Sequence, residues 1–245
     1  MPSITTKYNK IYQDLKSKIE DKTYEAQELL PSEAILTSYY DCSRNTVRRA
    51  IANLALEGYV QSLHGKGVRV IYQPHAQSAY AFGNVESFHE ASIRNGKIAK
   101  TEVPLFVELV VDQHIAKRTS FPVGIEIYYI QRIRCMEQKA LIIDHNYFRK
   151  DVVPGLTKEI AKGSIYNFIE NKLHVHIVTT KRVMTVEHVN QLDRKYLELG
   201  DYNCVAVVSN YTYNADGIMF EYTQSRHRPD YFAFYDQARR NSPEE

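Results

Sequence analysis

"SRNTVRRAIANLALEGYV", residues 43–60, is the stretch of sequence that predicts the fold of the N-terminal region. Its apolar residues return at the spacing of one helical face, and they are Val47, Ala50, Ile51 and Leu54. Ser43 is a favourable N-cap, and Gly58 is a residue type that commonly ends a helix. The stretch therefore predicts one amphipathic helix that begins after Ser43 and ends before Gly58.

The outward side of this helix is basic near its N-terminal end. Its polar residues there are Arg44, Asn45, Arg48 and Arg49. A solvated helix face would account for them. A recognition helix that presents its first turns to the major groove of DNA would do so as well. The neighbouring segments decide between these two interpretations.

Three neighbouring segments complete the pattern of a winged helix-turn-helix. A first helix is predicted from apolar positions at helical spacing, namely Tyr8, Ile11, Tyr12, Leu15 and Ile19. A second helix follows the predicted N-cap Ser32, and its expected buried face consists of Ile35, Leu36, Tyr39 and Tyr40. After the basic helix, the β-like runs 59–63 and 68–72 flank His64-Gly65-Lys66-Gly67, which predicts a hairpin. Helix, helix, basic helix and hairpin in this order favour DNA binding over a solvated face.

The charge distribution supports the same interpretation. The chain has 245 residues, enough for two modest domains, and its formal net charge is +2. Residues 1–75 carry ten Lys and Arg against eight Asp and Glu, whereas the remainder carries 21 of each kind. The basic excess is therefore concentrated in the region that contains the predicted recognition helix.

These segments resemble the DNA-binding domain of the GntR family of bacterial repressors. The resemblance is carried by "LLPSE" at 29–33, by residues 43–60 and by "HGKG" at 64–67. It implies that the base- and phosphate-contacting positions are Ser43, Arg44, Asn45, Thr46 and Arg48. We expect Arg49 and Lys66 to contact the DNA backbone, and His64 and Gly65 to form a wing tip that enters the minor groove. Many members of the family have Arg where this chain has Ala34, so one expected contact is missing.

The remainder of the chain predicts a second domain of the α+β class. We expect the winged helix-turn-helix domain at 1–72, a linker at 73–80, the second domain at 81–240 and a frayed tail at 241–245. The segments rich in β-branched and aromatic residues predict strands at 102–111, 124–136, 138–148, 175–189, 204–213 and 218–228. The helical patterns lie at 155–163, 164–173 and 190–199. Short connections between consecutive strands predict an antiparallel sheet with helices packed against it.

Two features of the second domain suit an anionic ligand. Arg132 and Arg134 alternate on one predicted strand, so their side chains share a face about 7 Å apart. Ser164 and Tyr166 open a predicted helix, whose free amide groups suit a phosphate. An ion-pair ladder with Glu126 would also explain the arginines, and a plain N-cap would explain Ser164. Sequence spacing alone does not bring the two features together.

The second domain resembles the UTRA effector-binding domain of the HutC subfamily, which is related in fold to chorismate lyase. The resemblance implies a homodimeric repressor. Its implied effector-binding residues are Ser87, Arg132, Arg134, Asp144, Ser164, Tyr166 and Glu221. The segments at 148–170 and 220–240 are similar to members that control trehalose utilisation and respond to trehalose 6-phosphate. Many relatives have Glu at the position of Asp144. The shorter side chain of Asp144 either leaves room for a larger sugar or has no consequence.

The sequence also leaves two other functions open. Asp144 and Glu221 are the residue types of a glycosidase acid and nucleophile, which would make the domain an enzyme fused to a DNA-binding module. His174, His176 and His188 suggested a metal site, although no cluster with ligand spacing accompanies them. We expect a repressor without cofactor or metal and without enzymatic activity.

The expected compartment is the cytoplasm. Cys42, Cys135 and Cys204 are scattered and odd in number, which argues against a disulfide framework. No apolar run reaches the roughly 18 residues that a membrane span needs, and residues 1–10 lack the apolar core of a signal peptide.

Overall fold

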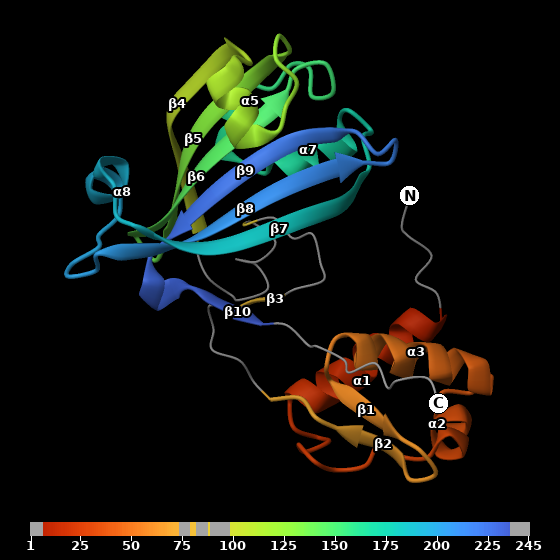
Figure 1. The fold of residues 1–245 in the computed structure, drawn as a ribbon. Helices are drawn as coiled ribbons and strands as arrows, with labels where there is room; N and C mark the ends of the chain where they lie inside the picture. Colours follow the sequence, from red (N-terminus) through yellow and green to blue (C-terminus); the bar gives the residue numbers. More distant parts are fainter. Residues whose placement is uncertain (1–6, 74–78, 82–87, 89–98, 236–245) are drawn as a thin grey trace, which may run out of the picture. The chain divides into compact units, whose positions relative to one another are not determined.

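The computed structural model describes residues 7–73, 79–81, 88 and 99–235, and it divides the chain into two compact units (Figure 1). The N-terminal unit comprises Met1–Ala76 with Asp236–Glu245, and the C-terminal unit comprises Gln77–Tyr235. Most of the expected linker and all of the expected tail lie outside the described residues, whereas positions 79 and 80 belong to a short strand. No helix within the described ranges is long and apolar enough to cross a membrane.

The N-terminal unit contains the predicted elements in the predicted order. Its helices are α1 (Lys7–Glu20), α2 (Glu33–Tyr39) and α3 (Arg44–Leu56). The strands β1 (Val60–Leu63) and β2 (Gly67–Val70) pair in an antiparallel hairpin. The winged helix-turn-helix prediction is confirmed.

The N-terminal core consists of apolar side chains from all three helices and the hairpin. Its buried members are Ile11, Tyr12, Leu15, Ile19, Leu30, Leu36, Val47, Ala50, Ile51, Leu54, Val60 and Val70. The prediction was wrong for Ile35 and Tyr39, whose side chains are 59% and 68% exposed. Because α2 has only seven residues, it turns a single side chain, Leu36, fully into the core. The ring of Tyr39 instead covers the ammonium group of Lys18 at 4.7 Å.

The C-terminal unit is built on a six-stranded antiparallel sheet in the order β4-β5-β6-β9-β8-β7 (Figure 1). Its strands are β4 (Ala99–Val110), β5 (Glu126–Met136), β6 (Lys139–Arg149), β7 (Ile177–His188), β8 (Cys204–Asn214) and β9 (Met219–His227). A separate pair, β3 (Ala79–Ala81) and β10 (Ala233–Tyr235), is parallel, and a short 3-10 turn at Pro229–Tyr231 precedes β10. Each group of three consecutive strands forms a meander as predicted, but β9 pairs with β6, so β7 lies at the sheet edge.

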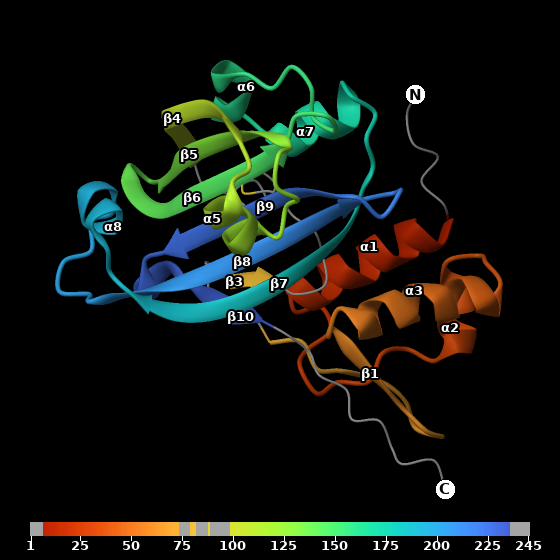
Figure 2. The same ribbon diagram turned by 45° about the horizontal axis from the view of Figure 1, so that its top comes forward.

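Short helices cover both faces of this sheet, with α5 on one side and α7 on the other (Figures 1 and 2). They are α5 (Gln113–Thr119), α6 (Lys158–Lys162), α7 (Ile165–Asn171) and α8 (Gln191–Tyr196). The sequence did not predict α5, which Asp112 caps by accepting a hydrogen bond from the Ile115 amide at 2.7 Å. The other three helices confirm the predictions, with shorter bounds.

Strand alternation divides the core of the C-terminal unit into two layers. We call the first side the α6–α7 face, where Ile130 and Phe148 pack against Ile165 and Ile169. The second side is the α5–α8 face, and its buried residues include Ile133, Ile143, Tyr147 and Tyr222. Arg132 and Asp144 share the parity of Ile130 and Phe148 on their strands, so both lie on the α6–α7 face.

Candidate nucleic-acid interface and ligand site

The first turn of α3 is capped and exposed, as a DNA-reading helix requires. The Ser43 hydroxyl accepts a hydrogen bond from the Thr46 amide at 3.3 Å, which fixes where the helix begins. The exposed residues of this end are Ser43, Arg44, Asn45, Arg48 and Arg49, and Thr46 is partly buried. Since Val47 and Ala50 are buried beneath them, a rigid core supports this row of donors.

A carboxylate on α2 holds the Arg48 side chain. Its Nε lies 2.9 Å and 3.0 Å from the two carboxylate oxygens of Glu33. This hydrogen bond lowers the pKa of Glu33 below its ordinary value. The Arg48 side chain remains 61% exposed, and its two Nη groups make no hydrogen bond with the described residues. Glu33 therefore orients a guanidinium whose outer nitrogens stay available, which the sequence analysis did not anticipate.

Arg49 is held differently, by stacking on α1. Its guanidinium carbon lies 3.9 Å from the ring centroid of Tyr8, a cation–π contact. Arg48 and Arg49 are thus adjacent in sequence but anchored to different helices. The expected backbone contact of Arg49 remains a prediction.

The wing tip is narrow because two glycines shape its turn. Gly65 and Gly67 have φ angles of +68° and +106°, values that residues with a Cβ atom rarely adopt. The Lys66 amide donates to the carbonyl of Leu63 at 3.0 Å and closes the turn. His64, Gly65 and Lys66 are all exposed. The tip therefore combines a small cross-section with the exposed basic side chain of Lys66.

The C-terminal unit brings five of the seven predicted effector-binding residues to the α6–α7 face. Four of them are buried, namely Arg132, Arg134, Asp144 and Glu221, and Tyr166 is partly buried. Ser164 is the N-cap of α7, where its hydroxyl accepts from the Asn167 amide at 3.2 Å. Ser87 lies outside the described residues.

Arg134 forms a buried ion pair with the strand beside it. Its Nε lies 2.6 Å from Asp144 Oδ2, and its Nη1 donates to the Thr101 hydroxyl at 2.8 Å. Ser225 donates to the other oxygen of Asp144 at 2.7 Å. Burial raises the pKa of Asp144, but the charges of Arg134 and Arg132 and these hydrogen bonds outweigh it and leave that pKa below its ordinary value. Asp144 is therefore ionised, and each of its two oxygens accepts a hydrogen bond from a neighbour.

Among the residues that the structure describes, Arg132 has no carboxylate partner of its own. Its Nη2 donates to the carbonyl of Gly163 at 2.6 Å, which brings the guanidinium to the junction between α6 and α7. Burial, followed by the charge of Arg134, lowers the pKa of Arg132 well below its ordinary value. The site thus contains a buried cation that is less well compensated than Arg134.

Glu221 is the acceptor at the centre of a polar chain. Tyr166 donates to its Oε2 at 2.7 Å, and Thr223 donates to its Oε1 at 2.7 Å. The amide nitrogen of Asn146 donates in turn to the Thr223 hydroxyl at 2.8 Å. Burial raises the pKa of Glu221 above its ordinary value and that of Tyr166 well above its own. Asn146 and Thr223 were not predicted from the sequence, although strand alternation places them on the face of Asp144 and Glu221.

Both units match known protein families. Residues 7–70 match the family described as bacterial regulatory proteins, gntR family, and residues 94–233 match the UTRA domain. This chain belongs to the GntR family. It is a DNA-binding transcriptional regulator with a UTRA domain, which confirms the resemblance drawn from the sequence.

Two relatives of this GntR-family regulator come from Bacillus subtilis (strain 168). The HTH-type transcriptional regulator TreR is 38% identical over 96% of this chain and 98% of its own length. The HTH-type transcriptional regulator GmuR is 26% identical over 92% of this chain and 95% of its own length.

Solved structures share the fold. The possible transcriptional regulator YydK from Bacillus subtilis superposes with a TM-score of 0.81 at 20% identity, covering 96% of this chain and all of that one. The effector-binding domain of the B. subtilis trehalose repressor TreR gives a TM-score of 0.53 at 36% identity, covering 58% of this chain and 99% of that one.

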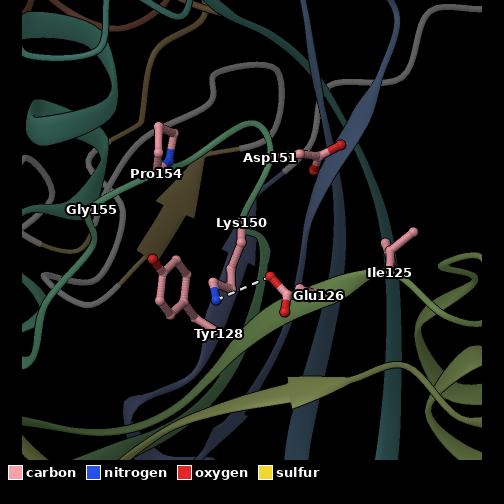
Figure 3. A pocket seen from close by; sticks show the side chains of 7 residues that line it. All are labelled: Ile125, Glu126, Tyr128, Lys150, Asp151, Pro154 and Gly155. Carbon is pink, nitrogen blue, oxygen red and sulfur yellow. Dashed lines mark ion pairs between the residues drawn. The ribbon is translucent and has the colours of Figure 1, made fainter.

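A hollow of about 410 Å³ in the UTRA domain of this regulator is separate from the predicted ligand residues (Figure 3). It is lined by Ile125, Glu126, Tyr128, Lys150, Asp151, Pro154 and Gly155. Glu126 pairs there with Lys150 at 3.2 Å, so the alternative of an ion-pair ladder between Glu126 and the arginines is wrong. This hollow contains neither Arg132 nor Arg134.

The metal and glycosidase alternatives gain no support from the geometry of this GntR-family protein. His174 and His176 precede β7 instead of sharing a strand face, and His174 has a φ angle of +56°. In the described part of the chain, no three His, Cys, Asp or Glu side chains gather as metal ligands. Asp144 and Glu221 accept hydrogen bonds from separate donors, Asp144 from Arg134 and Ser225 and Glu221 from Tyr166 and Thr223.

Proposed function

We propose that this regulator represses a trehalose utilisation operon and leaves its operator when trehalose 6-phosphate binds the UTRA domain. The observation that carries the proposal is a pair of buried arginines on one strand, of which only Arg134 has a carboxylate partner within the described part of the chain. The 38% identity to TreR over nearly the whole chain supports the choice of sugar.

Arg132 is the centre of the proposed phosphate site. Asp144 already compensates the charge of Arg134, whereas the one hydrogen bond of Arg132 within the described ranges is to a neutral carbonyl. A phosphate would compensate the buried charge of Arg132 and accept charge-assisted hydrogen bonds. Ser164 and Tyr166 belong to the helix that follows Gly163, so they are placed to complete the shell, and we propose Ser87 as a further ligand.

The carboxylates supply the proposed sugar contacts. Asp144 and Glu221 are fixed by neighbouring donors, and each carboxylate retains acceptor capacity for a sugar hydroxyl. Since Asp144 is held ionised by Arg134, it suits hydrogen-bond acceptance rather than proton donation. We propose binding and release of the effector without turnover.

The proposed DNA complex is a homodimer on a two-fold operator in the cytoplasm, where the bacterial chromosome lies. Helix-turn-helix proteins that read palindromic sites bind as dimers. The edge strand β7 supports self-association, because Val178, Val183 and Val186 are 57%, 51% and 74% exposed. Exposed apolar edge strands are unfavourable in a monomer and are commonly covered by pairing.

The test is release from operator DNA by the effector. Trehalose 6-phosphate should release the wild type, whereas unphosphorylated trehalose should not. Losing one guanidinium removes a charge-assisted hydrogen bond of roughly 1.5–3 kcal/mol, so Arg132→Ala or Arg134→Ala should weaken the effector about tenfold to a hundredfold. Both variants should still bind operator, and Arg194→Ala, an exposed arginine on α8, is the matched control. Unchanged release midpoints in both variants would refute the phosphate site.

A panel of other sugar phosphates and carboxylic acids tests the identity of the effector. A ligand at 100 times its dissociation constant should add about 2.7 kcal/mol of stability, which a thermal-shift assay detects. If another compound stabilises the protein and trehalose 6-phosphate does not, that compound is the effector instead. Consumption of the ligand at an enzymatic rate would contradict a pure sensor.

A further inference from the structure

Two buried hydrogen-bonding atoms on the α6–α7 face have no partner among the described residues. They are Arg132 Nε, a donor, and Asn146 Oδ1, an acceptor. The two residues are only 4% and 3% exposed. Buried polar groups in folded proteins nearly always have a partner, so unpaired ones next to a proposed ligand site point to something that binds there.

The hydrogen bonds around Asn146 fix the orientation of its amide. Thr223 gives its hydroxyl proton to Glu221, so its oxygen can only accept from Asn146. Asn146 must therefore present Nδ2 to Thr223, and turning the amide over would place two acceptors against each other. This leaves Oδ1 directed away from Thr223 and without a donor.

The strand register places this acceptor beside the free donor. Arg132 lies opposite Asp144, and Asn146 lies two residues further along β6 opposite Ile130. Arg132 and Asn146 are thus diagonal neighbours on adjacent strands, on the order of 7–8 Å apart at the backbone, and both belong to the α6–α7 face. One small group between them can reach both atoms.

The required chemistry is that of a hydroxyl group. A hydroxyl accepts from Arg132 Nε and donates its proton to Asn146 Oδ1, whereas a phosphate dianion offers no proton and an ammonium group offers no acceptor. We propose that Asn146 and Arg132 Nε together bind one sugar hydroxyl of the effector, which makes Asn146 a specificity-determining residue for the polyol part. This inference rests on the proposed function and deepens it.

Arg132 then has two tasks within one guanidinium. Its Nη2 is used by Gly163, and Nε is assigned to the hydroxyl, which leaves Nη1 for the anion. Asn146 should matter only for ligands that carry a hydroxyl, whereas Arg132 should matter for every anion. This difference separates the two residues experimentally.

The experiment is calorimetric titration of the full-length protein with trehalose 6-phosphate and with inorganic phosphate. Asn146→Leu keeps the volume but removes both the Oδ1 acceptor and the Nδ2 donor to Thr223. It should weaken trehalose 6-phosphate about three- to tenfold, the loss of one neutral hydrogen bond to the ligand. Its affinity for inorganic phosphate should match that of the wild type. Arg132→Ala should weaken both ligands.

The matched control is Gln131→Leu, a buried amide on the opposite α5–α8 face, which donates to the Tyr129 hydroxyl at 2.9 Å. It loses one buried hydrogen bond as well, and both of its affinities should stay at the wild-type values. Asn146→Ala serves as a second variant if the Leu variant does not fold, as judged from its circular dichroism.

Three outcomes would decide against Asn146. Wild-type affinity for trehalose 6-phosphate in both Asn146 variants would mean that water alone occupies the position. An equal loss for inorganic phosphate would reveal a purely structural role. If the folded wild type binds neither ligand, the proposed function fails together with this inference. If the wild type binds and Arg132→Ala weakens binding, the proposed function stands, and unchanged affinities in the Asn146 variants refute only the role of Asn146.

Discussion

The two units of this regulator place their charges in opposite environments. In the N-terminal unit, Arg44, Arg48 and Arg49 are exposed above a core of apolar side chains. In the C-terminal unit, Arg132 and Arg134 are buried. Among the described residues, every buried polar or charged side chain lies between Thr119 and His227, and therefore in the C-terminal unit.

The difference fits the sizes of the ligands that we propose for the two units. Duplex DNA cannot enter a small domain, so its phosphates and base edges are contacted from the surface, in a salt-dependent way. A sugar phosphate is small enough to be enclosed, where each hydrogen bond is stronger but each unpaired group is more costly. Removing a charge should therefore affect mainly binding in the first unit, and both folding and binding in the second.

The largest expected effect is on the stability of the C-terminal unit. Asp193 is fully buried and accepts two hydrogen bonds from Arg226, both at 2.8 Å. Asp193→Ala leaves the Arg226 charge buried with less compensation and should lower the free energy of unfolding by about 3–5 kcal/mol. Urea denaturation of the full chain measures this loss.

The matched control is Glu33→Ala, which breaks the exposed pair with Arg48 and should cost less than about 1 kcal/mol. Equal losses in the two variants would remove the proposed contrast between the units.

Acidification should destabilise the C-terminal unit through two buried histidines. Burial lowers the pKa of both His145 and His227 to about 4 from an ordinary 6.5. The unfolded chain therefore binds more protons between pH 6.5 and 4, so the stability that each neutral histidine contributes is present above 6.5 and is lost as the pH falls toward 4. Each histidine accounts for up to about 3 kcal/mol.

Burial raises the pKa of Glu221, so its contribution to stability increases as the pH falls, opposite to that of the histidines. The contribution of one histidine is therefore measured with a single variant. The slope of unfolding free energy against pH should become shallower in His145→Gln. An unaltered slope would show that His145 does not titrate in this window. His64 is the sole histidine of residues 7–73 and is exposed, so the described part of the N-terminal unit contains no buried histidine.

Arg44 and Arg48 should affect operator binding without affecting folding. Replacing either with Ala should weaken operator binding by roughly 1–3 kcal/mol per lost base contact in a gel-shift titration. Glu33→Ala should cause a smaller loss, because it frees Arg48 to adopt other rotamers. Arg49→Ala should weaken operator and random DNA to a similar degree. Normal operator binding by the Arg44 and Arg48 variants would show a solvated face after all.

The smallest expected effect concerns the wing. Lys66→Glu should weaken operator and random DNA alike and make the salt dependence shallower by about one unit, since one phosphate contact is lost. The measurement is the slope of log affinity against log salt concentration. A loss restricted to the operator would show that the wing reads sequence.

Local signals predicted most of the N-terminal unit. The caps Ser32 and Ser43, the helix end at Gly58 and the glycine turn of the wing all act within a few residues, and the structure confirms them. The exception is α2, where periodicity assigned four residues to a face that has room for one fully buried side chain. The length of a helix and its position on the core decided this, and neither is encoded in the spacing.

In the C-terminal unit, the sequence by itself determined the strands and their alternation, and hence that Arg132 and Arg134 share a face. Only the tertiary structure decided that β9 lies beside β6, which brings Glu221 and Thr223 next to Asn146 and Asp144. The pairing of strands separated by some 70 residues depends on burying both faces of the sheet at once. No local pattern specifies that condition, so the buried network around Asn146 became visible only in the folded chain.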